Sequence, residues 1–320
     1  MLITLLDRAS LGEDTPLGYL SEIGEVEIYD ATKADEVCSR VACSEILIIN
    51  KVKITKEVFE AAKKLKLICV FATGYDNIDL DEARAKNVAV CNVPGYSSPS
   101  VALQTVAMVT SLMTHLNEYR SYVKSGAYTS SGVPNCLVPV YHELAGKTWG
   151  IIGYGGIGKA VARVANAFDA NVIVNKRNPV NDIRCVDLDT LASESDIITI
   201  HCPLTDLTRG MINARLIDLM KPSVILINEA RGAVLNENDV ADAVLSGKIS
   251  GFGCDVYGVE PFTSDHPYNK IKDLDNVILT PHCAWGAYES RERCMNIIID
   301  NIKSFLNSET LNRVDILKQK

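Results

Sequence analysis

The sequence predicts an α/β protein of two doubly wound domains, each built on a parallel sheet. Short apolar runs rich in β-branched residues alternate with amphipathic stretches along the chain, and this rhythm occurs twice. The 320 residues also exceed what one ordinary hydrophobic core accommodates. Continuous apolar strands separated by helices are typical of parallel sheets covered on both faces.

The first half of the chain contains five predicted strands, LITLL at 2–6, EVEIYD at 25–30, EILIIN at 45–50, KLICVFA at 66–72 and VAVCNV at 88–93. Before the fourth strand, TKEVFEAAKKL places Val58, Ala61 and Leu65 on one face of a helix. The alternation predicts a sheet whose strands are joined by covering helices.

The second half repeats this pattern with six predicted strands, TWGIIG at 148–153, ANVIVN at 170–175, DIITIHC at 196–202, SVILIN at 223–228, ISGFGCDV at 249–256 and NVILTP at 276–281. A helical pattern over 97–124 and a loop rich in Ser, Gly and Pro at 125–141 separate the halves. A last helix at 290–306 is expected to return to the first domain. The predicted domains are therefore residues 1–97 with 291–320, and residues 98–290.

Net charge and cysteine usage limit the classes of partner. The formal net charge of −8 provides no overall field to attract nucleic acid or an anionic membrane. The ten cysteines include no CxxC pair, and most lie in apolar runs, which favours a reducing compartment over disulfides or a metal site. The longest apolar tract is interrupted by polar residues. We expect a cytoplasmic protein without a bound metal.

A glycine-rich turn, GYGGIG, follows the first strand of the second half and opens a helix. In a strand–turn–helix–strand setting this motif binds the pyrophosphate of a dinucleotide. Gly153 allows the tight turn, Gly155 lets the pyrophosphate approach the backbone, and Gly158 lets helix and strand pack closely. Gly156 and Ile157 complete the predicted cofactor turn. The alternative is a glycine turn that binds no ligand.

The end of the next strand, VNKRN, suggests which dinucleotide is bound. An acid at this place would accept hydrogen bonds from a free ribose 2′-hydroxyl, whereas the chain has Asn175, Lys176 and Arg177. Cationic donors instead favour a 2′-phosphate. We therefore expect NADP(H) to be preferred. The alternative is that Lys176 and Arg177 are solvated turn residues, in which case NAD(H) is also used.

Four motifs extend this interpretation, namely FATGYDNIDL at 71–80, HCPLTDLTRGMIN at 201–213, LINEARG at 226–232 continuing to DVYGVEP at 255–261, and NVILTPHCAW at 276–285. In this order they resemble the D-isomer-specific 2-hydroxyacid dehydrogenase family. The resemblance implies a Rossmann cofactor domain inserted into a flavodoxin-like substrate domain. It also implies a small 2-keto or 2-hydroxy acid substrate and a homodimer, with the segment 125–146 in the contact.

By this resemblance Arg231, Glu260 and His282 are the catalytic residues. Reduction of a 2-keto acid needs a hydride at the carbonyl carbon and a proton on its oxygen, and histidine is a suitable proton donor near neutral pH. A neighbouring carboxylate orients the imidazole, and an arginine holds the substrate carboxylate in a planar contact. Taken alone, each residue has a structural alternative as a loop or surface side chain.

Further site residues are assigned because they match motifs of the family. Thr73 and Gly74 match a turn whose backbone amides bind the substrate carboxylate, and Tyr96 and Trp285 match positions beside the substrate. The alternatives are a turn needed only for its shape, a core tyrosine and a tryptophan that packs without selecting a substrate. The residues assigned to the cofactor by this resemblance, with ordinary loop packing as their alternative, are Pro203, Thr208 and Asp255.

Two positions depart from the family pattern. Glu229 stands where a small or neutral residue is usual, and this acid either weakens the hold of Arg231 on a carboxylate or points outward. Leu103 replaces a frequent glutamate, which removes any role for that acid.

The motifs PHCAW and IINK resemble the glycerate dehydrogenase (hydroxypyruvate reductase) branch, so hydroxypyruvate and glyoxylate are the expected substrates. The alternatives are a D-lactate or broad D-2-hydroxyacid dehydrogenase and, in a different class, a dinucleotide-sensing corepressor-like binding protein.

Overall fold

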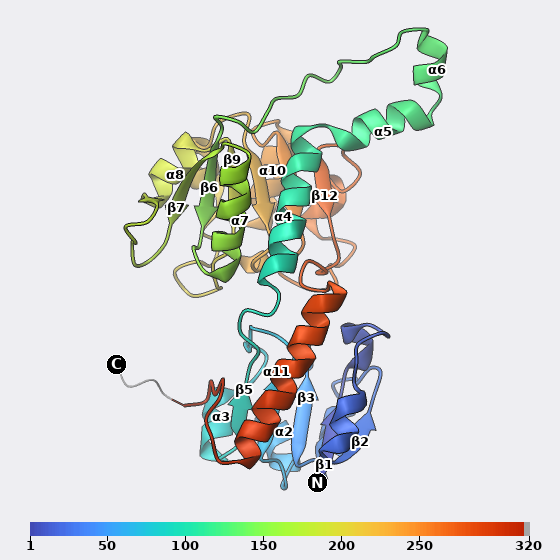
Figure 1. The fold of residues 1–320 in the computed structure, drawn as a ribbon, viewed down its shortest axis with the longest axis vertical. Coiled ribbons are helices and arrows are strands. Elements are labelled where there is room, and N and C mark those ends of the chain that lie inside the picture. The colour runs from blue at the N-terminus through green and yellow to red at the C-terminus, as the bar shows by residue number, and fades with distance from the viewer. Residues whose placement is uncertain (317–320) are drawn as a thin grey trace. The chain divides into compact units, whose positions relative to one another are not determined.

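The structure, a computed structural model, describes residues 1–316 and divides into two compact units. The first contains residues 1–97 together with the described residues from 286 onward, and the second contains residues 98–285. Figure 1 shows the ribbon of both. The last four residues of the segment 291–320, which the sequence assigns to the substrate domain, lie outside the described residues.

The first unit is built on a five-stranded parallel sheet with the order β2-β1-β3-β4-β5. This is the flavodoxin-like order. The strands are β1 (Leu2–Leu5), β2 (Glu25–Ile28), β3 (Ile46–Ile49), β4 (Leu67–Val70) and β5 (Ala89–Cys91). The helices are α1 (Val37–Val41), α2 (Lys56–Ala61), α3 (Leu80–Ala85) and α11 (Tyr288–Leu306), and short 3₁₀ turns span Arg8–Leu11 (η1) and Gly18–Glu22 (η2). Helix α11 packs on β4, so the C-terminal segment completes the domain that the N-terminal residues begin.

The second unit is built on a seven-stranded parallel sheet with the order β12-β11-β10-β9-β6-β7-β8. Its strands are β6 (Thr148–Ile152), β7 (Asn171–Asn175), β8 (Arg184–Cys185), β9 (Ile197–Ile200), β10 (Ile225–Asn228), β11 (Gly251–Cys254) and β12 (Val277–Leu279). The strand order reverses between β6 and β9, which creates the topological switch point at which Rossmann folds bind dinucleotides. The two doubly wound sheets predicted from the sequence are thus confirmed.

Helices cover both faces of the second sheet. Buried residues of α4 (Ser98–Met113) and α7 (Gly156–Ala167) pack with Trp149, Ile151 and Ile227 on one face. Residues of α8 (Leu188–Glu194), α9 (Ala214–Leu219) and α10 (Glu237–Leu245) pack with the alternate strand residues on the other. The remaining short turns are η3 (Gly232–Val234) and η4 (Pro267–Lys270). The near-continuous apolar strands follow from this double cover, because both faces of each central strand are buried.

The helix predicted over 97–124 is wrong in its continuity. Helix α4 ends at Met113, and α5 (Leu116–Lys124) begins after His115, which has a left-handed backbone with φ of 52°. A residue in this conformation ends an α-helix. All residues of α5 are at least partly exposed, so packing on the core does not impose a continuous helix there. The loop predicted over 125–141 also contains a short helix, α6 (Ala127–Ser131).

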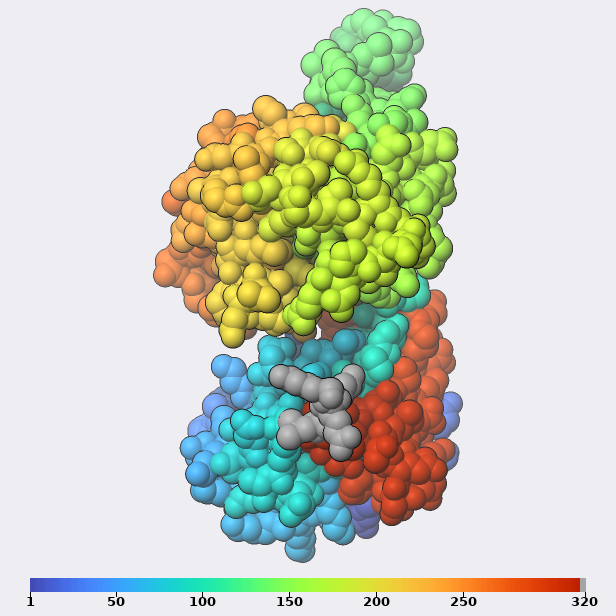
Figure 2. All heavy atoms as spheres, turned by 90° about the vertical axis from the view of Figure 1, so that its left-hand side faces the viewer, coloured from blue at the N-terminus to red at the C-terminus, as the bar shows by residue number. Residues whose placement is uncertain are grey.

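The segment from α5 through the loop after α6 projects from the rest of the second unit (Figures 1 and 2, green). Its most exposed apolar side chains are Leu137, Val138 and Val140, at 70%, 76% and 71% exposure. Such a run of exposed apolar residues marks an interaction surface more often than an ordinary solvated loop. Among residues 1–316, none of the helices is long and apolar enough to cross a membrane.

Candidate active site

The carboxyl edge of the second sheet carries a row of residues that includes two of the predicted site residues, Gly153 and Asp255. The register pairs Ile152 with Ile200, Ile200 with Asn228, Asn228 with Cys254, and Cys254 with Leu279. One residue further along, the row therefore reads Gly153, His201, Glu229, Asp255 and Thr280. Successive side chains of a strand alternate between faces, so these five residues lie on the face that α4 and α7 cover.

The glycine turn has the geometry of a phosphate cradle. Gly153 has a φ of 96°, and a Cβ there would lie 2.6 Å from the carbonyl carbon of His201. At Gly158 a Cβ would lie 2.2 Å from the carbonyl oxygen of Gly153. Gly155 differs, because a Cβ there would meet no atom of the described chain within 4 Å. Gly155 directly precedes the first turn of α7, and the backbone N–H groups of such a turn attract phosphate.

The residues predicted to select the cofactor follow β7. The amide Nδ2 of Asn175 donates to the carbonyl of Val186 at 3.0 Å, and its own carbonyl accepts from Gly153 N at 2.9 Å. Asn175 therefore ties the glycine turn to β7 and to the chain after β8. Lys176 is half-buried and Arg177 is exposed, and within residues 1–316 neither forms an ion pair. Both cations remain available to an anionic ligand.

The predicted loop residues after β9 bond to each other. The hydroxyl of Thr208 donates to the carbonyl of Pro203 at 2.8 Å and accepts from the backbone N–H of Thr205, also at 2.8 Å. These bonds close the loop 203–208 upon itself and fix the chain that leaves β9. Ordinary loop structure accounts for both predicted residues.

Arg231 is presented by a turn that only glycine permits. It lies between β10 and η3, its carbonyl accepts from Asn228 Nδ2 at 3.0 Å, and its Nη1 donates to the Ala230 carbonyl at 2.8 Å. A Cβ at the next residue, Gly232, would lie 2.0 Å from the carbonyl carbon of Tyr257. The turn is therefore pressed against the chain after β11.

The structure brings Glu260 and His282 together. His282 Nδ1 lies 2.6 Å from Glu260 Oε2, and the other carboxylate oxygen accepts from Tyr257 N at 3.0 Å. Their side chains retain 22% and 29% exposure for histidine and glutamate, respectively. The carboxylate is thus fixed by the backbone on one side and fixes the imidazole on the other. Nε2 is the ring nitrogen on the side away from this carboxylate.

Asp255 anchors the loop that presents His282, a role that the sequence analysis missed. Its Oδ1 accepts from Thr280 Oγ1 at 2.6 Å and from Cys283 N at 2.8 Å, and its Oδ2 accepts from Ala284 N at 2.9 Å. His282 lies at the apex of this loop with a φ of 52°. A single buried carboxylate therefore holds both sides of a strained turn. The family resemblance assigned Asp255 only to the cofactor.

Glu229 is buried and does not point outward, which makes that alternative wrong. The residue is 7% exposed, and its Oε2 is hydrogen-bonded to the hydroxyl of Thr105 on α4. The other oxygen, Oε1, is buried without a hydrogen-bond partner among residues 1–316. Burial above all raises the pKa of Glu229 to about 8, with the nearby Asp255 adding to the rise against the effect of Thr105. Glu229 is thus uncharged at neutral pH.

His201 is the neighbour of Glu229 on β9, and it also escaped the sequence analysis. Both ring nitrogens are buried, and neither has a partner within the described part of the chain. Burial lowers the pKa of His201 to about 3, so the ring is neutral. The sequence could not reveal this environment of His201. The residues beside it come from neighbouring strands, and they depend on how those strands pair.

Three predicted substrate residues belong to the first unit. Thr73 and Gly74 follow β4, where Thr73 Oγ1 donates to the Val93 carbonyl and Asn92 Nδ2 donates to the Thr73 carbonyl, both at 2.8 Å. Tyr96 follows β5 and is 5% exposed. The fourth, Trp285, is half-buried at the end of the second unit.

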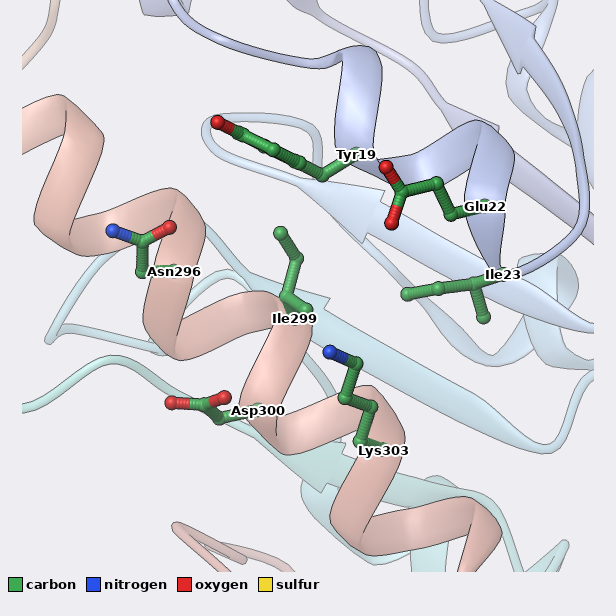
Figure 3. Close-up of a pocket in the computed structure, with 7 residues that line it drawn as sticks. All are labelled: Tyr19, Glu22, Ile23, Asn296, Ile299, Asp300 and Lys303. Carbon is green, nitrogen blue, oxygen red and sulfur yellow. The ribbon is translucent and has the colours of Figure 1, made fainter.

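A pocket of about 340 Å³ in the first unit lies between η2 and α11 and does not include these residues. Figure 3 shows Ile23, Ile299 and Lys303 pointing into it.

Comparison with known proteins identifies the family. Residues 106–284 match the family described as D-isomer specific 2-hydroxyacid dehydrogenase, NAD binding domain. A hydroxypyruvate reductase of Blautia hydrogenotrophica is 36% identical over 98% of this chain and 100% of its own. A glycerate dehydrogenase of Methylorubrum extorquens is 35% identical over 98% of both. The structure of Aquifex aeolicus D-lactate dehydrogenase, complexed with NAD and lactic acid, has a TM-score of 0.87 and 31% identity, covering 99% of this chain and 100% of its own.

Fold and site together define an oxidoreductase that uses a nicotinamide dinucleotide, with a Rossmann sheet, a glycine cradle and a histidine–carboxylate pair at one sheet edge. The chain belongs to the D-isomer-specific 2-hydroxyacid dehydrogenase family. The prediction of family and enzyme class from the sequence is therefore confirmed.

Proposed function

We propose that this enzyme reduces small 2-keto acids, hydroxypyruvate and glyoxylate before others, to D-2-hydroxy acids with NADPH as the preferred reductant. The observation that carries the proposal is the contact of His282 Nδ1 with Glu260 Oε2 at 2.6 Å, on the edge that also presents Arg231. A dehydrogenase of ketone–alcohol chemistry needs a positioned proton donor, and this pair provides one.

Each of the site residues has a separate role in the reaction. The bound nicotinamide dinucleotide supplies the hydride that reaches the carbonyl carbon. His282 gives the proton from Nε2 to the carbonyl oxygen, which completes the alcohol. Glu260 fixes the orientation of the imidazole ring through Nδ1 and balances the positive charge of the protonated ring. The guanidinium of Arg231 holds the substrate carboxylate and polarises the carbonyl.

The preference for NADPH rests on Lys176 and Arg177. Each charge-assisted hydrogen bond to a 2′-phosphate contributes about 1.5–3 kcal/mol. Asn175, Pro203 and Thr208 shape the same adenosine end through the bonds that hold their loops. If the two cations are solvated instead, NAD(H) serves equally well.

The substrate assignment rests on Trp285 and on the relatives. A tryptophan three residues beyond His282 narrows the space for a substituent, which favours small acids. The two curated relatives are named for hydroxypyruvate and glycerate. The second candidate is a D-lactate dehydrogenase, favoured by the likeness to the Aquifex aeolicus structure.

We also propose a homodimer formed through the projecting segment 125–146. Leu137, Val138 and Val140 on this segment are more than two-thirds exposed, and an apolar run of this kind is unfavourable in water unless a partner covers it. Light scattering after gel filtration tests the proposal. Replacing Leu137 and Val140 with Asp should convert a dimer to a monomer, and a wild-type monomer would overturn the assignment.

The test of function is a set of initial rates on hydroxypyruvate, glyoxylate and pyruvate, each with NADPH and NADH. We expect hydroxypyruvate to give the highest kcat/KM, and NADPH to exceed NADH by at least roughly tenfold. The double variant Lys176→Ala with Arg177→Ala should lose the preference. Highest rates on pyruvate would favour the D-lactate candidate, equal rates with both cofactors would remove the role of the cations, and no turnover on any acid would favour a binding protein.

A further inference from the structure

Glu229 occupies a position where a charge would act on a bound nicotinamide. It follows β10 in the row between His201, which follows β9, and Asp255, which follows β11. The pyrophosphate cradle begins at Gly153, at one end of this row, and the loop of His282 is anchored at the other. A nicotinamide that delivers hydride beside His282 therefore lies over the middle of the row. This placement rests on the proposed function.

The two contacts of the Thr105 hydroxyl suit an uncharged Glu229 better than an ionised one. The hydroxyl contacts the carbonyl of Val101 at 2.8 Å, and it also makes a close contact with Glu229 Oε2. A threonine hydroxyl has one hydrogen, and a backbone carbonyl can only accept. An uncharged Glu229 lets both bonds form together, because it can donate its own proton to Thr105 while Thr105 donates to Val101; an ionised Glu229 takes the hydroxyl hydrogen and leaves the Val101 contact unbonded.

The groups that face Glu229 do not favour its ionised form. From the end of β11 the carboxylate of Asp255 repels a second negative charge, while Cys254, on the other face of the sheet, is a buried thiol whose pKa is raised by burial. From β9 comes the neutral ring of His201, and α4 contributes the hydroxyl of Thr105.

Within the segment that carries Glu229 itself, the cation is Arg231, whose Nη1 is bonded to the Ala230 carbonyl. With Oε1 unpaired, an ionised carboxylate here would be poorly solvated.

We infer that Glu229 is held as a neutral carboxylic acid in the working enzyme, and that its charge state sets the relative affinity for oxidised and reduced cofactor. The oxidised nicotinamide ring is a cation and the reduced ring is neutral. Ionised Glu229 attracts the cation through the low-dielectric site and leaves the neutral ring almost unaffected. Because the carboxyl oxygens are shielded, this effect acts through the field and does not need contact with the cofactor.

The experiment measures dissociation constants for the oxidised and reduced cofactor, NADP⁺ and NADPH, by titration calorimetry on the full chain without substrate. In the wild type, the ratio of Kd for NADP⁺ to Kd for NADPH should fall roughly tenfold as the pH rises through the pKa of Glu229, about 8. In Glu229→Gln, which stays neutral, the ratio should not change with pH. Infrared difference spectra should contain a protonated carboxyl band at neutral pH that Glu229→Gln lacks.

A ratio that is independent of pH in the wild type would overturn the inference, as would the same pH dependence in Glu229→Gln. The infrared band keeps the inference testable if the variant folds poorly, because its absence from the wild type would also contradict it. Failure of the proposed function has a different outcome. In that case no keto acid turns over, whereas the binding ratios still report on Glu229.

Discussion

His282 Nδ1 and Glu260 Oε2 lie 2.6 Å apart, although 22 residues separate them in the chain. The contact depends on two backbone supports, the bond from Tyr257 N to Glu260 Oε1 and the Asp255 carboxylate under the His282 loop. The pair is therefore set before substrate arrives, as general acid catalysis requires.

Glu260→Gln should lower kcat for keto acid reduction by roughly 10²-fold or more, because the amide no longer balances a protonated His282. KM should change less, since the substrate carboxylate is held elsewhere. Steady-state rates across a pH range measure both. The matched control is Glu118→Gln, which removes a histidine–glutamate contact of similar length, 2.7 Å between Glu118 Oε1 and His115 Nδ1, on the projecting segment. Equal losses in both variants would contradict the assignment.

Asp255→Asn should destabilise the fold and slow catalysis together. The carboxylate accepts three hydrogen bonds, from Thr280 Oγ1, Cys283 N and Ala284 N, and an asparagine would turn an N–H toward at least one of these donors. We expect a loss of about 2–4 kcal/mol in the free energy of unfolding. Urea unfolding and kcat measure the two effects. A variant of full stability and full activity would mean that the loop does not depend on Asp255.

Gly155→Ala and Gly158→Ala should separate ligand binding from folding. A Cβ at Gly158 would lie 2.2 Å from the Gly153 carbonyl oxygen, so that variant should unfold at a markedly lower Tm. A Cβ at Gly155 meets open space within the described chain, so its Tm should stay near the wild-type value. Its Kd for the dinucleotide should nevertheless rise by roughly tenfold, because the methyl group occupies the approach of the pyrophosphate. Unchanged cofactor binding in Gly155→Ala would argue against the cradle.

The sequence could predict features that depend on local pattern. The spacing of apolar residues and the turn residues predicted both sheets, and the order of the motifs predicted the family. The glycine cradle could be predicted because it is a local strand–turn–helix feature. The sequence could not reveal that Asp255 supports the His282 loop, because three bonds to residues 25 to 29 positions away arise from the pairing of β11 with β12. The burial of Glu229 likewise depends on α4 lying over β10 and β11.

Glu229→Gln should stabilise the protein at neutral pH. The folded-state pKa of Glu229, about 8, exceeds the ordinary value of 4.5, so the unfolded chain ionises first as the pH rises. The contribution of Glu229 to the free energy of unfolding is then fully present below pH 4.5 and is lost progressively up to about pH 8. At pH 7 the variant should be more stable than the wild type by up to about 3 kcal/mol. At pH 4.5 this advantage should nearly disappear.

Urea unfolding of the variant and wild type at several pH values measures the difference. The exposed Glu60 offers a control, Glu60→Gln, which removes a carboxyl group outside the core. A stability difference between Glu229→Gln and wild type that does not grow with pH would show that Glu229 is ionised in the folded protein. That result would also count against its role in cofactor preference.

His201→Asn should make the protein less sensitive to acid. Burial lowers the folded-state pKa of His201 from 6.5 to about 3, so on acidification the unfolded chain takes up a proton first. The contribution of His201 to the free energy of unfolding is therefore fully present above pH 6.5 and is lost as the pH falls toward 3. Between pH 7 and pH 5 the wild type should lose about 2 kcal/mol more than the variant. Urea unfolding at both pH values measures this, with the exposed His142 replaced in a control, His142→Asn. Equal acid sensitivity in His201→Asn and wild type would mean that burial does not lower the pKa of His201 in the fold.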